Sequence, residues 1–147
     1  MADLAVLLVL AAARRLREGI SAVFDGDWCT WSPTWLIGCQ LTDKTIGIIG
    51  LGRIGLSTAK RLKPFLGNNG RILYAGRTVK KEAEEFDAKK VDFDVLIKEA
   101  DVVIISCSLT EETRGMFDYE VFKKMKRSVV CLIRQLMLWI SRRNCTL

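Results

Sequence analysis

One stretch constrains the fold of this chain more than any other: residues 45–55 read TIGIIGLGRIG. An apolar run at residues 46–49 leads into glycines at positions 50, 52 and 55, and a segment compatible with a helix follows at residues 53–65. A strand, a glycine turn and a helix with the spacing G-x-G-x-x-G are typical of a unit that binds a dinucleotide. The alternative is a glycine-rich turn in another kind of α/β protein, but the flanking strand and helix favour dinucleotide binding.

Each glycine of the motif has an expected role. Gly50 permits the tight turn, Gly52 lets the backbone approach a pyrophosphate, and Gly55 lets the helix pack against the strand. The free amides at the start of the helix then face the phosphates, where the helix dipole favours negative charge.

Composition excludes several other classes of protein. The 147 residues are enough for about one domain with its own core. The net charge of +6 comes from basic residues that are not interleaved with aromatic ones, so we expect no nucleic-acid partner. The five cysteines form no C-x-x-C pair and the chain contains no histidine, which argues against a zinc site and for reduced thiols in a cytoplasmic protein.

The first 25 residues predict a helix rather than a leader or a membrane anchor. Residues 4–13 are almost all apolar, but Asp3 precedes them and three arginines follow, the reverse of a signal peptide. The run is also too short to span a bilayer, so we expect no membrane partner. We interpret residues 2–25 as one buried helix that is amphipathic from Arg14 onward; secretion is the less favoured alternative.

A tryptophan-rich segment follows at residues 26–41. It contains Trp28, Trp31 and Trp35 around Pro33. Side chains of this size need burial, so we expect core packing or a subunit interface rather than a platform for stacking bases.

The second strand, predicted at residues 71–75, indicates which nucleotide is bound. In NAD-specific units an acidic residue at this strand end binds the ribose hydroxyl. Here Gly76, Arg77 and Thr78 follow the strand, and no acidic residue occurs between Tyr74 and Lys81. Arg77 can offer a forked donor to a 2′-phosphate, Thr78 a hydroxyl, and Lys80 a point charge. We therefore favour NADP, with NADPH preferred over NADH; the alternative is that Arg77 only solvates a turn.

The remainder alternates short helices and strands. Helices are predicted at residues 80–86, 93–100 and 119–126, and strands at 89–91, 101–106 and 128–133. Asp92 is an expected cap for the helix that begins at residue 93. This alternation implies right-handed crossovers and a doubly wound parallel sheet. Ser108 follows the strand 101–106 at the sheet edge where ligands bind, so it is a candidate cofactor contact, although a plain loop serine is the alternative.

Five separated segments resemble one family: TIGIIGLGRIG, RLKPF, YAGR, SCSLT and VFKKMK. Together they are similar to the cofactor domain of the D-isomer-specific 2-hydroxyacid dehydrogenases, and within that family to the glyoxylate/hydroxypyruvate reductases. The resemblance covers residues 2–133. It implies NADPH-dependent reduction of glyoxylate or hydroxypyruvate to a D-2-hydroxy acid by a cytoplasmic homodimer. It also implies cofactor contacts at Arg53, Ile54, Gly55, the turn at residues 77–80, and Ser108.

The resemblance divides the chain into three parts. Residues 1–41 correspond to a linker and dimerisation helix with the tryptophan-rich segment, residues 42–133 to a partial NAD(P)-binding Rossmann domain, and residues 134–147 to a divergent basic tail that we expect to be irregular. The fold class is therefore α/β: an incomplete Rossmann domain (a doubly wound parallel sheet) with an N-terminal helix.

The catalytic groups of the family have no counterpart in these residues. Family members carry a substrate domain before the position of Ala2, and after the strand that ends at Ile133 they supply an arginine, a glutamate and a histidine. The chain continues instead as RQLMLW, with Arg142 only a faint echo of the family arginine, and it has no histidine. Since a group with a pKa near neutral must donate a proton to the reduced ketone, we expect no catalytic residue here.

Three functional hypotheses follow. The chain is a reductase of this family by descent, or an NADP-binding module that is catalytically inactive and pairs with full-length subunits, or a truncated product without function. The missing elements should leave one side of the sheet uncovered, so we expect marginal stability for the free monomer.

Overall fold

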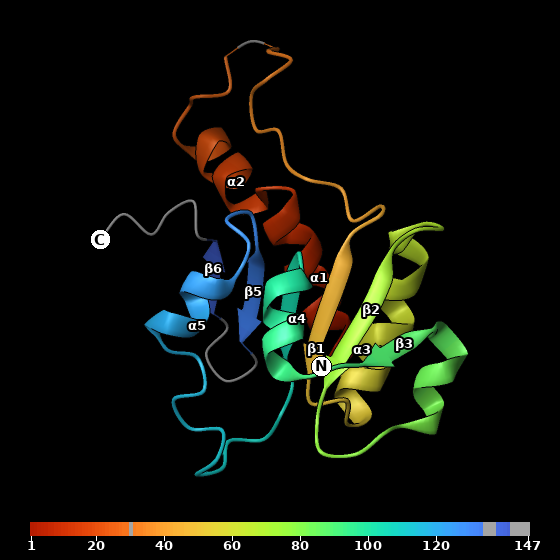
Figure 1. Cartoon of the computed structure of the whole chain (residues 1–147). Coiled ribbons are helices and arrows are strands. Elements are labelled where there is room, and N and C mark those ends of the chain that lie inside the picture. Colours follow the sequence, from red (N-terminus) through yellow and green to blue (C-terminus); the bar gives the residue numbers. More distant parts are fainter. Residues whose placement is uncertain (30, 134–137, 142–147) are drawn as a thin grey trace.

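The computed structural model describes residues 1–29, 31–133 and 138–141, and a six-stranded sheet lies at its centre (Figure 1). The strands are β1 (Thr45–Ile49), β2 (Arg71–Ala75), β3 (Ala88–Lys90), β4 (Val102–Ile105), β5 (Val130–Ile133) and β6 (Leu138–Ser141). The helices are α1 (Ala2–Ala13), α2 (Leu16–Phe24), α3 (Arg53–Leu62), α4 (Phe93–Glu99) and α5 (Tyr119–Lys124), with 3-10 turns at Lys63–Leu66 and Lys81–Phe86.

The sheet order is β3-β2-β1-β4-β5-β6, and the pairs among β1 to β5 are all parallel. This confirms the predicted doubly wound α/β fold. The chain leaves β1 for β2 on one side and later returns to place β4 on the other. Ligand sites of such sheets form at the carboxyl ends of the strands beside this reversal.

The last strand corrects the expectation for the tail. We expected residues 134–147 to be irregular, but β6 pairs antiparallel with β5, with Cys131 opposite Ile140. The sheet edge at β5 is therefore covered by a strand. The other tail residues, Arg142 among them, lie outside the described part of the chain.

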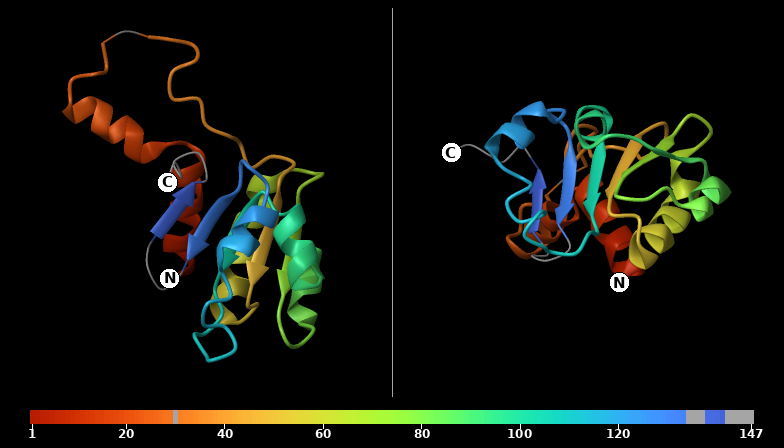
Figure 2. Two further views of the ribbon diagram at one scale, coloured as in Figure 1. Left: turned by 60° about the vertical axis from the view of Figure 1, so that its left-hand side comes forward. Right: turned by 60° about the horizontal axis from the view of Figure 1, so that its bottom comes forward.

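Two apolar clusters hold the layers together, one on each face of the sheet. Alternate residues of each strand point to opposite faces. Ile46 and Ile48 of β1 belong to the cluster under α1 and α3, whereas Ile49 belongs to the cluster under α4 and α5. Figure 2 shows the two helical layers with the sheet between them. Every residue of β1 is buried, so the strand that leads into the glycine turn lies within the core.

The N-terminal region is two helices, so the prediction of one buried helix over residues 2–25 was wrong. Arg15 adopts a left-handed conformation (φ +54°) and separates α1 from α2. Helix α1 is apolar over most of its surface and packs on α3, with Val9 fully buried. Helix α2 buries only Ala22 and exposes several apolar side chains, among them Phe24 at 85%. It extends away from the sheet together with the loop after it (Figure 2).

The tryptophans are not part of the core of this chain, which excludes one of the two expected environments. The exposed fractions of Trp28, Trp31 and Trp35 are 59%, 85% and 37%. Trp28 and Trp35 contact each other edge to face, with ring centroids 5.1 Å apart. The second expectation, a subunit interface, stays a prediction.

Two aspartates begin helices, and only one acts as a cap through its side chain. The Asp118 carboxylate accepts a hydrogen bond from the amide of Val121 at 2.8 Å and so caps α5. Asp92 occupies the N-cap position of α4, as predicted, but its side chain makes no capping hydrogen bond. Asp92 lines a cleft instead.

No helix within the described ranges combines the length and the apolar character needed to cross a bilayer.

Candidate functional site

A cleft of about 580 Å³ opens at the carboxyl ends of β1, β2 and β4. Its wall contains four of the residues predicted from the sequence: Gly50, Gly52, Arg77 and Ser108. The other predicted residues, Arg53, Ile54, Gly55, Thr78 and Lys80, lie outside the wall. The sheet thus brings together parts of three loops that are far apart in the sequence, as the topology predicts.

Two of the three motif glycines are required by the packing of the protein itself. Gly50 has a φ of +88°, and a Cβ there would lie 2.6 Å from the backbone nitrogen of Cys107. A Cβ on Gly55 would lie 2.6 Å from the carbonyl oxygen of Gly50 and 2.9 Å from the Ser106 hydroxyl. A side chain at either position would therefore push α3 or the loop after β4 away from β1.

Gly52 differs, because no packing contact among the described residues requires a glycine there. Apart from its neighbours in the chain, no described atom would lie within 4 Å of a Cβ on Gly52. Its φ of −83° and ψ of −169° are accessible to any residue. Gly52 caps α3 and lines the cleft, where the amides of the first helical turn have no acceptor within the helix. The open space above Gly52 and these amides fit a phosphate-bearing ligand.

Ser106 holds the glycine turn in place, a role that the sequence analysis missed. Its hydroxyl donates to the carbonyl oxygen of Gly50 at 2.5 Å, and its amide donates to the carbonyl oxygen of Ile49 at 2.9 Å. The amide of Gly50 donates in turn to the carbonyl oxygen of Ala75 at 2.9 Å. The signal available in the sequence was a hydroxyl residue directly after the apolar strand that pairs with β1.

The turn after β2 is attached to the protein at both ends. The backbone amide of Lys80 donates to the Tyr74 hydroxyl at 3.1 Å, and the Lys90 ammonium donates to the carbonyl oxygen of Arg77 at 3.4 Å. Tyr74 belongs to the apolar cluster under α1 and α3, so the contact draws Lys80 toward that face. Arg77 lines the cleft, whereas Thr78 and Lys80 do not.

Ser108 belongs to the loop after β4, which also lines the cleft. Its carbonyl oxygen accepts a hydrogen bond from the Thr113 hydroxyl at 2.8 Å, and the same hydroxyl accepts from the amide of Thr110 at 2.8 Å. These bonds order the loop after β4. The wall also contains two acidic residues that the sequence analysis did not place there: Glu112 from the same loop and Asp92 from the start of α4.

The most extensively bonded carboxylate of the sheet, Asp101, lies away from the cleft at the amino end of β4. It accepts hydrogen bonds from the amide of Thr45 at 2.8 Å and from the Lys126 ammonium at 2.7 Å. Burial alone raises the pKa of Asp101, but these two bonds outweigh burial and hold it below its usual value. The group therefore connects β1, β4 and the segment before β5, and has a structural role.

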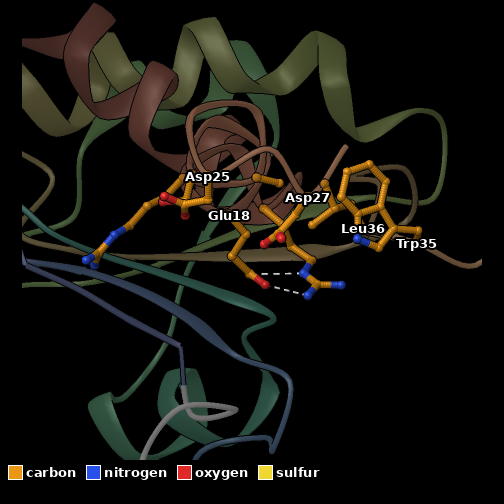
Figure 3. Close-up of a pocket in the computed structure, with 9 residues that line it drawn as sticks. Glu18, Asp25, Asp27, Trp35 and Leu36 are labelled. Atoms are coloured by element: carbon orange, nitrogen blue, oxygen red, sulfur yellow. Dashed lines mark hydrogen bonds and ion pairs between the residues drawn. The ribbon is translucent and has the colours of Figure 1, made fainter. Parts of the chain in front are cut away.

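A second hollow of about 460 Å³ lies between α2 and the tryptophan-rich loop. Figure 3 shows Glu18, Asp25 and Asp27 beside Trp35 and Leu36 in its lining. Glu18 accepts a hydrogen bond from the Arg15 guanidinium at 3.0 Å. None of the predicted site residues lines this hollow, and in the described ranges no three acidic, cysteine or histidine side chains are grouped as a metal site would require.

Comparison with known proteins shows which family the chain that forms this cleft resembles. The family profile described as "D-isomer specific 2-hydroxyacid dehydrogenase, NAD binding domain" matches residues 6–133. The glyoxylate reductase/hydroxypyruvate reductases of Mus musculus and Homo sapiens are 46% and 47% identical to the chain over 130 residues, which is 88% of this chain and 39% of each relative. The chain therefore spans about two fifths of the length of the curated relatives it matches.

Solved structures with a similar fold also match most of this chain. The TT0316 protein from Thermus thermophilus superimposes with a TM-score of 0.82 at 39% identity, over 90% of this chain and 40% of that one. The apo form of D-lactate dehydrogenase from Escherichia coli has a TM-score of 0.79 at 28% identity, again over 90% of this chain and 40% of the other.

Proposed function

The chain belongs to the D-isomer specific 2-hydroxyacid dehydrogenases, and from this membership we propose that residues 42–133 bind NADPH within a glyoxylate/hydroxypyruvate reductase. The observation that carries the proposal is the open space over Gly52 at the start of α3. The fold itself needs glycine at positions 50 and 55, but only a bound pyrophosphate needs it at position 52.

We assign each candidate residue a role in binding the cofactor. The amides of Arg53 and Ile54 face the pyrophosphate from the first turn of α3, with Gly52 leaving room for it. Gly55 keeps the helix close to β1, and Ser108 contacts the cofactor from the loop after β4. The bound nicotinamide supplies a hydride to a small 2-oxo acid.

Preference for NADPH over NADH depends on the turn after β2. Arg77 lines the cleft at the strand end where NAD-specific units carry an acidic residue. Thr78 and Lys80 follow it on the same exposed turn and complete the candidate phosphate contacts. A planar guanidinium can donate two hydrogen bonds to a 2′-phosphate, which NADH lacks.

We propose no catalytic residue among these 147 residues. Reduction of a 2-oxo acid needs a proton donor with a pKa near neutral, and the sequence contains no histidine. The second candidate function is therefore an NADP-binding module that is inactive alone and pairs with full-length subunits.

A homodimer formed through α2 and the tryptophan-rich loop is the proposed assembly. Exposed apolar side chains gather on these two segments: Leu16, Ile20, Val23, Phe24, Trp28, Trp31 and Ile37. Apolar surface of this extent is typical of a protein interface. The cytoplasm is the proposed location, which the thiols of Cys29 and Cys39, neither of them in a disulfide, support.

Titration of the purified 147-residue chain with NADPH and NADH tests the cofactor proposal. We expect saturable binding of NADPH, weaker binding of NADH, and a roughly tenfold loss of NADPH affinity in Arg77→Ala, since a charge-assisted hydrogen bond contributes about 1.5–3 kcal/mol. The control is Arg127→Ala, an exposed arginine outside the cleft. Absence of NADPH binding to the folded wild-type chain would refute the proposal.

Steady-state assays separate the two candidate functions. With glyoxylate or hydroxypyruvate and NADPH, we expect no turnover above background from these 147 residues alone. A measurable rate that is lost in Arg77→Ala would show that the chain supplies its own proton donor and would remove the inactive-module candidate.

A further inference from the structure

Lys90 is a basic residue of the cleft that the family motifs do not explain. It ends β3, where it pairs in register with Tyr74 of β2, and the next amide, of Val91, donates to the Tyr74 carbonyl oxygen at 3.0 Å. This pairing brings Lys90 to the edge of the sheet from which the turn containing Arg77 departs. Both residues line the cleft.

The Lys90 ammonium lies beside the backbone of Arg77. Its Nζ is 3.4 Å from the Arg77 carbonyl oxygen, at the long end of hydrogen-bond distances. The cleft thus receives one basic residue from the turn after β2 and one from the end of β3.

These two cations also differ from their neighbours in what they contact. Lys60 pairs with Glu85 and Lys63 with Asp87, at 3.7 Å and 3.3 Å. In the described part of the chain, neither Arg77 nor Lys90 forms an ion pair with a carboxylate. Their charges therefore remain available to an anionic ligand.

We propose that Lys90 is a specificity-determining residue, which together with Arg77 forms a two-cation site for the 2′-phosphate of NADPH. The inference rests on the proposed function of the cleft. A phosphomonoester carries about −1.5 to −2 charges at pH 7, so a single arginine leaves part of it uncompensated. An ammonium on a flexible stem can follow the phosphate while the guanidinium holds its orientation.

Lys89 provides a matched control. It is the preceding residue of the same strand and is also exposed, but it does not line the cleft. Successive residues of a strand point to opposite faces, so the two lysines differ in direction and not in chemistry. Lys89→Gln removes the same charge from the chain without removing it from the cleft.

The experiment measures dissociation constants of NADPH and NADH for the wild-type chain, Lys90→Gln and Lys89→Gln by fluorescence titration, with a thermal melt of each variant to check its fold. We expect Lys90→Gln to weaken the binding of NADPH roughly three- to tenfold and to leave the binding of NADH unchanged, because only NADPH carries the 2′-phosphate. Lys89→Gln should leave both constants within about twofold of wild type, as expected for an exposed charge outside the site. The loss in Lys90→Gln should shrink at high salt.

The other outcomes are separable. If the wild-type chain binds neither nucleotide, the proposed function of the cleft fails and this inference fails with it. If the wild-type chain binds NADPH and Lys90→Gln binds it equally well, the inference is overturned while the proposed function stands. If Lys90→Gln weakens NADPH and NADH to the same extent, Lys90 only holds the turn through the Arg77 carbonyl oxygen, and the inference is again overturned.

Discussion

At the scale of single residues, the glycine motif separates into structural and ligand-directed positions. Gly50 and Gly55 lie against backbone atoms of the protein, at distances that exclude a Cβ. Gly52 faces open space in the cleft. The same motif therefore contains two positions that the packing of the protein requires and one for which we propose a role in binding.

Alanine substitutions should show this difference. Gly52→Ala should change the free energy of unfolding by no more than about 1 kcal/mol, because Ala at a helix N-cap position is only moderately unfavourable. It should weaken NADPH by about tenfold or more, since the new methyl group occupies the space proposed for the pyrophosphate. Gly55→Ala should instead lower the free energy of unfolding by about 1–3 kcal/mol through overpacking against the Gly50 carbonyl.

Urea denaturation and nucleotide titration of both variants make the comparison. Equal loss of stability in the two variants would show that Gly52 is also structural. Unchanged NADPH affinity in a stable Gly52→Ala variant would contradict the pyrophosphate assignment.

At the scale of elements, α2 and the loop after it differ from the rest of the chain. Helix α1 packs on α3 and the sheet, but α2 buries a single alanine. Phe24 and Trp31 are each 85% exposed. Since these side chains contribute little to the packing of one chain, their apolar surface is available to a second copy.

The double variant Phe24→Ser/Trp31→Ser should distinguish assembly from folding. We expect the wild-type chain to sediment as a dimer at micromolar concentration and the variant to sediment as a monomer, because aromatic side chains at an interface often contribute about 2 kcal/mol or more. The free energy of unfolding per monomer at low concentration should be unchanged, since exposed side chains make few contacts within the chain.

Tyr119→Ser is the matched control, because Tyr119 is 72% exposed on α5 at a distance in sequence and structure from α2. It should leave the dimer intact. A wild-type chain that remains monomeric at every accessible concentration would rule out the proposed assembly.

At the scale of the whole molecule, Asp101 ties the central strands to the segment before β5. Its carboxylate bonds the amide of Thr45 and the Lys126 ammonium, and its backbone carbonyl accepts from the amide of Val130 at 3.1 Å. Loss of the carboxylate charge should therefore weaken the domain as a unit and not one loop.

The lowered pKa of Asp101 sets the pH range of this effect. A depressed folded-state pKa stabilises the protein above the unfolded value of about 3.9, and the stabilisation is lost as pH falls through the folded value. Asp101→Asn should lower the free energy of unfolding by about 1–3 kcal/mol at pH 7 and make it less sensitive to pH below about 4.

Urea denaturation between about pH 2 and pH 7 measures both the loss of stability and its pH dependence. This range includes the usual carboxylate pKa of about 3.9. Glu82→Gln is the control, because Glu82 is exposed on the 3-10 turn Lys81–Phe86. If the free energy of unfolding of Asp101→Asn and that of the wild type fall equally with pH in acid, the carboxylate does not contribute through its charge.

The sequence by itself determined the elements of the sheet and the position of the cleft. Strands β1 and β2 contain short apolar runs, and such runs are typical of central strands in a parallel sheet, which are buried on both faces. The glycines at 50, 52 and 55 predicted the turn, and the alternation of strands and helices predicted a doubly wound parallel sheet with right-handed crossovers. The strand β6 was missed because an antiparallel pairing depends on a partner edge that no local pattern describes.

Only the tertiary structure decided which residues share the cleft and which surfaces remain exposed. Lys90, Asp92 and Ser106 reach the site through strand register and loop packing, which depend on contacts between residues far apart in the sequence. The exposure of Trp31 likewise could not be predicted from the sequence, because a tryptophan side chain is equally suited to a core and to an interface. Local patterns specify elements because hydrogen bonding and side-chain periodicity act within a few residues, whereas a site is assembled by packing across the whole sheet.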